Sequence, residues 1–157
     1  MTIATPTPEQ SHADARPRKV DELLAHYGAS HTQPTNELIH FAAIPLIILS
    51  LVGMMFWVHP WLAYAFVAAS LVYYARLSGV FLASMVVTSI ALLAVISAMG
   101  TLLLPLSIAI FVVAWVFQFI GHKLEGKKPS FFEDIQYLWV GPLFVLSKLF
   151  IKLGVRW

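Results

Sequence analysis

The chain has 157 residues, of which 59% are hydrophobic and only 11% are charged, a composition outside that of an ordinary soluble domain. The absence of cysteine excludes disulfides, thiolate metal sites and cysteine nucleophiles, so any metal must be held by histidine nitrogen and carboxylate oxygen. The formal charge of +2 is modest and scattered over segment ends, which indicates membrane topology signals and no nucleic-acid partner.

Residues 1–18 are polar and contain no apolar stretch, so we expect a flexible N-terminal tail and no cleavable signal peptide. Residues 19–157 are expected to form a single membrane-embedded helical domain. At its start, Val20, Leu23, Leu24 and Tyr27 recur at helical spacing. This pattern predicts a short amphipathic helix that lies on the membrane surface or on the protein and ends at Gly28.

Four apolar segments follow, and each predicts a membrane helix. The first is long enough to span a bilayer, and His40 is its one charge-capable interior residue. The second is short for a span and needs Arg76 to extend its side chain to the interface. The fourth carries Pro105 in its first turn, where a missing N–H costs least. The segments cover residues 38–58, 61–75, 80–99 and 102–120.

The last segment, residues 131–157, is divided by Gly141-Pro142. Lys148, Lys152 and Arg156 repeat every four residues and predict a basic stripe along one helical face. We favour a pair of interfacial or re-entrant helices here over a fifth straight span. The predicted fold is therefore an all-α, polytopic membrane helix bundle of about four transmembrane helices with C-terminal interfacial or re-entrant helices.

Lysine and arginine residues fall in alternate loops, which predicts the orientation of the bundle. The loops between the first and second spans and between the third and fourth carry none, whereas the others carry Arg16, Arg18, Lys19, Arg76, Lys123, Lys127 and Lys128. We therefore expect an integral protein of a bacterial inner membrane with both termini cytoplasmic. Residues 31–40 and 121–129 should then lie at the same membrane face.

The first of these two blocks reads HTQPTNELIH and contains His31, Asn36 and His40. Asn36 and His40 are four residues apart and share a helical face, whereas His31 must be folded back by the chain around Pro34 if it is to meet His40. An imidazole in a membrane helix indicates function unless it is satisfied by packing. The alternative is that His40 bonds a backbone carbonyl or Asn36 and ties helices together.

The second block contains His122 and Glu125, three residues apart, whose side chains reach one point on a continuing helix. Gly121 would let another group approach closely. Alternatively, Glu125 lies in a solvated turn and pairs with Lys127 or Lys128. Downstream, Ser130 and Glu133 form a capping box, which makes Glu133 a helix-start residue.

The remaining histidines are weaker candidates. His26 could join the site, but a salt bridge to Glu22 one turn earlier explains it more simply, and His59 is predicted at the opposite membrane face. His31, His40, His122 and Glu125 together offer nitrogen and oxygen ligands that suit Fe(II) or Zn(II). The sequence thus leaves three hypotheses open: an iron oxygenase acting on a lipid, a zinc-dependent lipid hydrolase, and a nonenzymatic lipid-binding or scaffold protein.

The two blocks resemble the membrane 2-hydroxy fatty acid dioxygenase family of fatty-acid alpha-oxidation. The resemblance rests on His31, Asn36 and His40 running into IPL, and on QFIGH followed by EGKKPSFFEDIQYLWVGPLF. It implies an Fe(2+)-dependent enzyme that takes a 2-hydroxy fatty acid and molecular oxygen to a fatty acid one carbon shorter, with His31, His40 and His122 as iron ligands. In that reading Asn36 and Glu125 are the catalytic candidates, and Asn36 hydrogen-bonds the substrate carboxylate or a ligand histidine.

Overall fold

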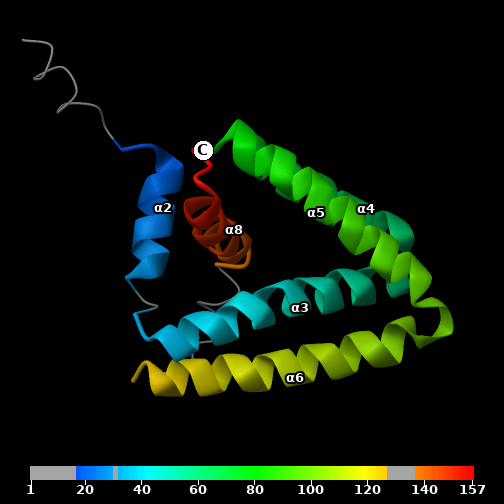
Figure 1. Cartoon of the computed structure of the whole chain (residues 1–157). Coiled ribbons are helices and arrows are strands. Elements are labelled where there is room, and N and C mark those ends of the chain that lie inside the picture. Colours follow the sequence, from blue (N-terminus) through cyan, green and yellow to red (C-terminus); the bar gives the residue numbers. More distant parts are fainter. Residues whose placement is uncertain (1–16, 30–31, 127–136) are drawn as a thin grey trace, which may run out of the picture.

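The computed structural model describes residues 17–29, 32–126 and 137–157, most of which lie in helices (Figure 1). No strand occurs in these three ranges, so the prediction of an all-α fold is confirmed. The elements are α2 (Lys19–Gly28), α3 (Pro34–Val58), α4 (Pro60–Ala75), α5 (Gly79–Ala98), the short 3₁₀ helix η1 (Gly100–Leu102), α6 (Leu103–Leu124) and α8 (Val140–Leu153).

Three of these helical segments are long and apolar enough to cross a membrane: Pro34–Val58, Gly79–Ala98 and Gly100–Leu124. The apolar helix α4 has 16 residues, somewhat fewer than the roughly 20 of a straight span. Large apolar side chains such as Val87, Ile90 and Val112 are more than half exposed, as expected of side chains that face lipid. The bundle agrees with the predicted set of about four membrane helices.

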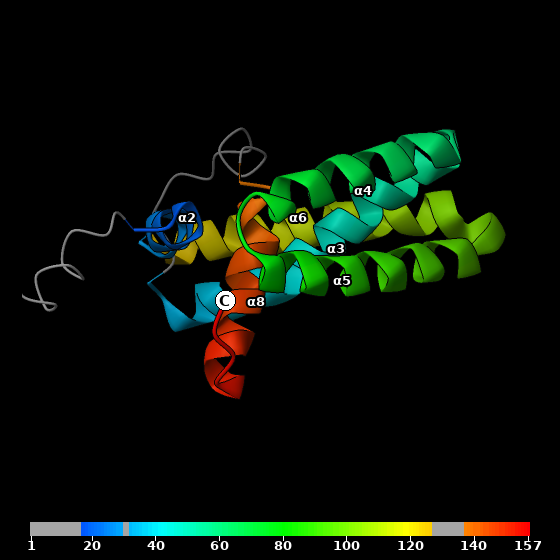
Figure 2. The ribbon, with the colours of Figure 1, turned by 90° about the horizontal axis from the view of Figure 1, so that it is seen from above.

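Helices α3 and α6 run antiparallel and lie side by side along their length, whereas α4 and α5 form a second pair (Figures 1 and 2). Small residues permit the close approach of α3 and α6. An ideal Cβ at Gly53 on α3 would lie 2.4 Å from Ser107 Oγ on α6. The start of α3 and the end of α6 are thereby fixed at the same end of the bundle.

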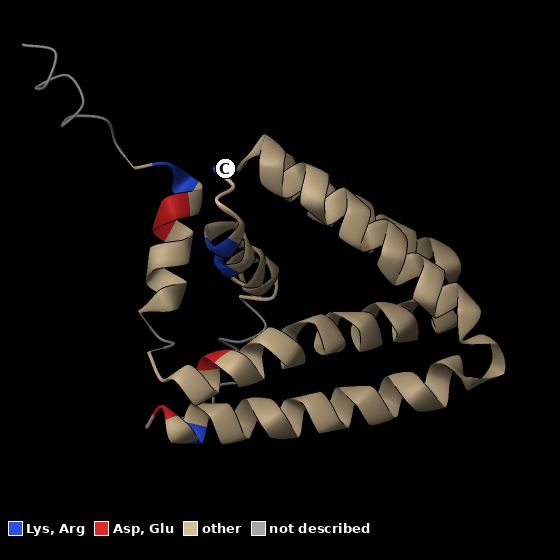
Figure 3. Cartoon of the chain, in the orientation of Figure 1, with Lys and Arg blue, Asp and Glu red and all other residues tan. Residues whose placement is uncertain are grey.

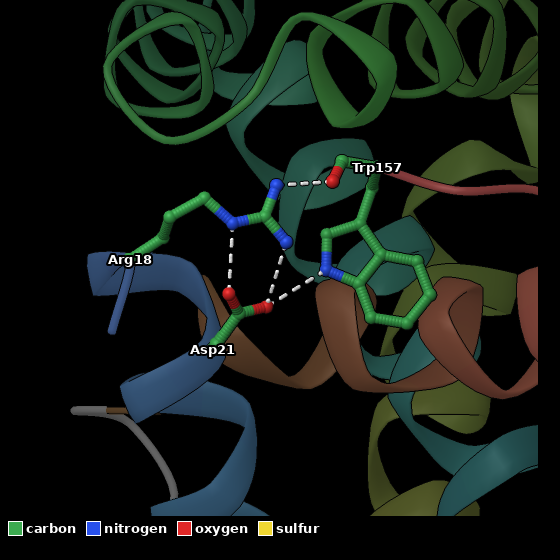
Figure 4. Close-up of polar contacts among 3 residues, drawn as sticks. All are labelled: Arg18, Asp21 and Trp157. Carbon is green, nitrogen blue, oxygen red and sulfur yellow. Dashed lines mark hydrogen bonds and ion pairs between the residues drawn. The ribbon is translucent and has the colours of Figure 1, made fainter. Parts of the chain in front are cut away.

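The amphipathic helix α2 lies on the protein, where it packs against α8. Val20 shares a buried apolar cluster with Leu143 and Phe150, and the rings of Tyr27 and Phe144 lie 5.0 Å apart. Figure 4 shows the polar contacts at the start of α2: Arg18 pairs with Asp21 at 2.8 Å and donates to the main-chain oxygen of Trp157, whose indole N–H donates to Asp21 at 3.1 Å.

Helix α8 differs from the prediction in one respect. The left-handed backbone of Gly154, with φ of 67°, ends the helix, so Arg156 lies beyond it and the predicted stripe of three basic residues is wrong. Lys148 instead pairs with Glu37 of α3 at 3.1 Å. Gly141 and Pro142 stand in the first turn of α8, and residues 131–136, where the other helix of the predicted pair would begin, lie outside the described ranges.

The charged residues of the described ranges gather at one side of the bundle (Figure 3). They occur in α2, at the start of α3, between α4 and α5, at the end of α6, and in α8 with the residues after it. Residues 38–75 and 77–122 contain no Asp, Glu, Lys or Arg. This distribution is typical of a bundle embedded in lipid with its charged loops at one face.

Candidate functional site

The structure brings His40 and His122 together at the charged side of the bundle. His40 lies in the second turn of α3 and His122 in the last turn of α6, and the antiparallel packing of these helices places the two rings side by side. Their centroids are 5.2 Å apart and their planes are almost perpendicular, at 83°. The His40 side chain is fully buried, whereas His122 is partly exposed.

The backbone of α3 fixes the orientation of the His40 ring. Nδ1 of His40 lies 3.0 Å from the carbonyl oxygen of Asn36, one turn earlier on α3. Because a carbonyl oxygen only accepts hydrogen bonds, this contact places the ring proton on Nδ1 and the lone pair on Nε2. The same arrangement, with one ring nitrogen donating to a carbonyl, is the usual one for histidines that bind metals.

The side chain of Asn36 links α3 to the end of α6, close to the two histidines. Its side chain is fully buried, and Nδ2 donates to Oε2 of Glu125 at 2.8 Å. This bond directs Oδ1 toward α6, where it has no hydrogen-bond partner among the described residues. An ideal Cβ at Gly121 would lie 2.3 Å from that oxygen, so any larger residue at this position would force Asn36 or a helix to shift. Gly121 therefore has the close-approach role that the sequence predicted.

Glu125, just after α6, holds the start of α3. Its carboxylate accepts hydrogen bonds from the backbone N–H groups of Thr32, at 2.8 Å, and of Gln33, at 3.1 Å, and from the Thr32 hydroxyl. Desolvation alone would raise the pKa of Glu125, but the hydrogen bonds from Thr32, Asn36 and Gln33 outweigh it and lower the pKa to about 2. Glu125 is thus an ionised acceptor that caps one helix from the end of another.

The other candidate residues lie apart from this pair or outside the described ranges. Nδ1 of His26 lies 3.0 Å from the Tyr137 hydroxyl, while Glu22 pairs with Lys19, so the predicted His26–Glu22 salt bridge is wrong. His59 stands between α3 and α4, about 28 Å along α3 from His40. The candidate ligand His31, the alternative partners of Glu125 and the capping box fall outside the described residues: His31, Lys127, Lys128, Ser130 and Glu133.

Comparison with known proteins gives the family. The model of a family described as "2-hydroxy-palmitic acid dioxygenase Mpo1-like" matches residues 18–83 and 80–153, which together take in both histidine blocks. The chain belongs to the Mpo1-like family. It is also 28% identical over 138 residues to the 2-hydroxy-palmitic acid dioxygenase MPO1 of Saccharomyces cerevisiae, covering 83% of this chain and 79% of that protein. No solved structure matches.

Two cavities lie among the described helices of this Mpo1-like chain, and their linings include neither His40 nor His122. The larger has a volume of about 350 Å³ and is lined almost wholly by apolar side chains of α3, α4, α5 and α8, together with Leu138 and Trp139. The smaller, of about 140 Å³, lies between α3, α6 and the turn before α8. Ile44 and Leu138 line both cavities and so separate them.

Sequence reasoning missed one polar residue beside this Mpo1-like site. Gln118 is only 3% exposed and lines the smaller cavity, one helical turn before His122. The signal was present in the sequence, because Gln118 and His122 are four residues apart in the QFIGH block and an amide inside an apolar span needs a partner.

Two imidazoles alone make an incomplete metal site. Among the described residues no group of three or more His, Asp or Glu side chains could hold a metal ion. His40 and His122 nevertheless fit as two ligands of one ion, because imidazoles bound to one metal at about 2.1 Å place their ring centroids roughly 5 Å apart. The separation of 5.2 Å between the two ring centroids is close to this value.

Proposed function

We propose that this chain is an iron-dependent dioxygenase that shortens 2-hydroxy fatty acids by one carbon at the charged face of a membrane. The observation that carries the proposal is the meeting of His40 and His122 at 5.2 Å in a chain of the Mpo1-like family. The description of the family and the name of the yeast relative both specify 2-hydroxy-palmitic acid and a dioxygenase. We propose in addition that the cofactor is iron and that the charged face is the cytoplasmic one.

Three histidines would hold the ion. His40 and His122 supply two imidazole nitrogens, and His31, which precedes Thr32 in the sequence, is the proposed third ligand. A ferrous ion with three such ligands supplies open coordination positions and electrons for oxygen chemistry. The carbonyl of Asn36 keeps the lone pair of His40 on Nε2, and the bond from Asn36 to Glu125 keeps α3 and α6 in register, so we assign Asn36 and Glu125 positioning roles.

The overall reaction balances without a further reductant. The bond between C1 and C2 of the 2-hydroxy acid breaks, C2 becomes the carboxyl carbon of the shortened acid, and C1 leaves as carbon dioxide. These two carbons lose four electrons in total, and one molecule of oxygen accepts four, with water as the remaining product. The need for oxygen alone is consistent with a chain that offers no flavin or nicotinamide fingerprint.

The bundle matches the two ends of such a substrate. A carboxylate would remain at the charged side, near Lys123, where the described charges gather. The apolar tail would continue from the smaller cavity along the apolar side chains of the membrane helices. The buried position of His40 keeps bulk water away from the reacting end.

The test is oxygen-dependent conversion of 2-hydroxypalmitic acid to the acid one carbon shorter by protein purified in detergent. We expect conversion that requires both oxygen and ferrous iron and that is lost in His40→Ala and His122→Ala. Full activity in both variants would disprove the iron site. Conversion of a lipid ester without oxygen would instead identify a hydrolase, and no conversion with no bound metal would identify a lipid-binding protein.

A further inference from the structure

The smaller cavity begins one helical turn from the histidine pair. On α3 its lining includes Ile44, four residues after His40, and on α6 it includes Gln118, four residues before His122. One turn of helix rises about 5.4 Å, so the cavity lies directly on the membrane side of the two rings. Its volume of about 140 Å³ has room for the first few carbons of an acyl chain and their substituents.

Gln118 lines this cavity and carries a buried amide oxygen, which is a hydrogen-bond acceptor. Its side chain is 3% exposed, and Oε1 has no hydrogen-bond partner among the described residues. A buried carbonyl oxygen without a donor is unfavourable, and such groups in proteins are nearly always satisfied by a protein group, a water molecule or a ligand. Because the oxygen only accepts, the group that satisfies it must carry an O–H or N–H; an ionised carboxylate does not.

We propose that Gln118 recognises the 2-hydroxyl group of the substrate by accepting its hydrogen bond in the smaller cavity. The inference rests on the proposed function, which supplies the 2-hydroxy acid. From the charged end of α6 toward the membrane, the order of residues is Lys123, His122 and Gln118. In the same direction, the proposed substrate would place its carboxylate first, then C2 with its hydroxyl group, and then the alkyl chain. Gln118 is thereby the residue that distinguishes a 2-hydroxy acid from an unsubstituted fatty acid.

Binding affinities test this assignment separately from turnover. We would measure the dissociation constants of 2-hydroxypalmitic acid and palmitic acid for the full chain in lipid nanodiscs under nitrogen, which prevents turnover. A hydrogen bond to a buried acceptor contributes about a factor of ten, so wild-type protein should bind the 2-hydroxy acid roughly tenfold more tightly. In Gln118→Met, which keeps the length of the side chain without the amide, this ratio should fall to about one.

A matched control and a second ligand make the result specific. Ser107→Ala also removes a buried polar atom from α6, but at a position that lines neither cavity, and should keep the wild-type ratio. For wild-type protein, 2-fluoropalmitic acid has a substituent of similar size that cannot donate, so it should bind no better than palmitic acid. This second measurement needs no variant and stands even if Gln118→Met fails to fold.

The outcomes also separate this inference from the proposed function. A tenfold preference that survives in Gln118→Met, or equal binding of the fluoro and hydroxy acids, would overturn it. Equal weakening of both acids together with a lower melting temperature in Gln118→Met would show a structural role and would also overturn it. Wild-type protein that shortens the substrate without this binding preference refutes the inference alone, whereas preference without shortening refutes the proposed function alone.

Discussion

A methyl group added at Gly121 would collide with the side chain that joins the two helices of the candidate site. The new Cβ would lie 2.3 Å from Asn36 Oδ1 and 3.3 Å from Cε1 of His40. Asn36 cannot easily turn away, because its amide is buried and bonded to Glu125 at 2.8 Å. Gly121→Ala should therefore push α3 and α6 apart where the two histidines meet.

The expected loss of stability is moderate. Overpacking of a close contact costs about 1–3 kcal/mol, and the better helix propensity of alanine returns up to about 1 kcal/mol, so we expect a net destabilisation of about 1–2 kcal/mol. The effect on the site should be larger, because a displacement of about 1 Å can lower a rate by roughly 100-fold. The assays are thermal unfolding in detergent and oxygen-dependent consumption of 2-hydroxypalmitic acid.

Two other glycines serve as controls. Gly79→Ala places its methyl group in open space, with nothing within 4 Å, and should change neither property. Gly53→Ala makes a similar collision on the same helix pair, 2.4 Å from Ser107 Oγ, but about 20 Å along α3 from His40. It should lower stability, recover with Ser107→Ala, and leave the site active. The prediction would be refuted if Gly121→Ala changed stability and activity as little as Gly79→Ala does, or if Gly53→Ala lowered activity as much as Gly121→Ala does.

Three further predictions concern single contacts. His40→Ala and His122→Ala should lower kcat/KM by more than about 100-fold, whereas His59→Ala, at the far end of α3, should leave it near the wild-type value, as steady-state kinetics would show. The pKa of Glu125 in the folded state is lowered from 4.5 to about 2, so its ionised carboxylate stabilises the fold fully above pH 4.5, and this stabilisation is lost as the pH falls toward 2. Glu125→Gln should make the melting temperature less dependent on pH between 4.5 and 2. A melting temperature that depends on pH in the variant as it does in the wild type would contradict the capping role. Trp157→Ala should lower the free energy of unfolding by about 1–3 kcal/mol and speed hydrogen exchange in α2, because the indole contacts Phe81 and Phe150 and donates a hydrogen bond to Asp21. Trp157→Phe should restore most of the stability but not the hydrogen bond.

Local features of the sequence were sufficient to predict most helices. Hydropathy and length placed the membrane segments, and Pro34 and Pro105 marked the first turns of α3 and α6 as expected. The alternation of basic loops predicted that the block of His40 and that of His122 share one face, and the structure places their rings 5.2 Å apart. These predictions succeed because the cost of burying charge and polar backbone in lipid acts on each segment separately.

Contacts between distant segments could not be predicted in the same way. The sequence did not predict that the carboxylate of Glu125 accepts hydrogen bonds from Thr32 and Asn36, more than 80 residues away. These bonds form because the antiparallel packing brings the start of α3 to the end of α6. Spacing also predicted a basic stripe through Arg156, although Gly154 ends α8 first. The hydrogen bond between His26 and Tyr137 was not predicted either, because the partner of a side chain depends on how distant elements pack.

The central claim is that imidazoles of α3 and α6 hold one iron ion, and metal content tests it most directly. Elemental analysis of protein purified without oxygen should find about one iron per chain in the wild-type protein and in His59→Ala, and none in His40→Ala or His122→Ala. Wild-type protein without stoichiometric iron, or full iron content in both site variants, would contradict the claim.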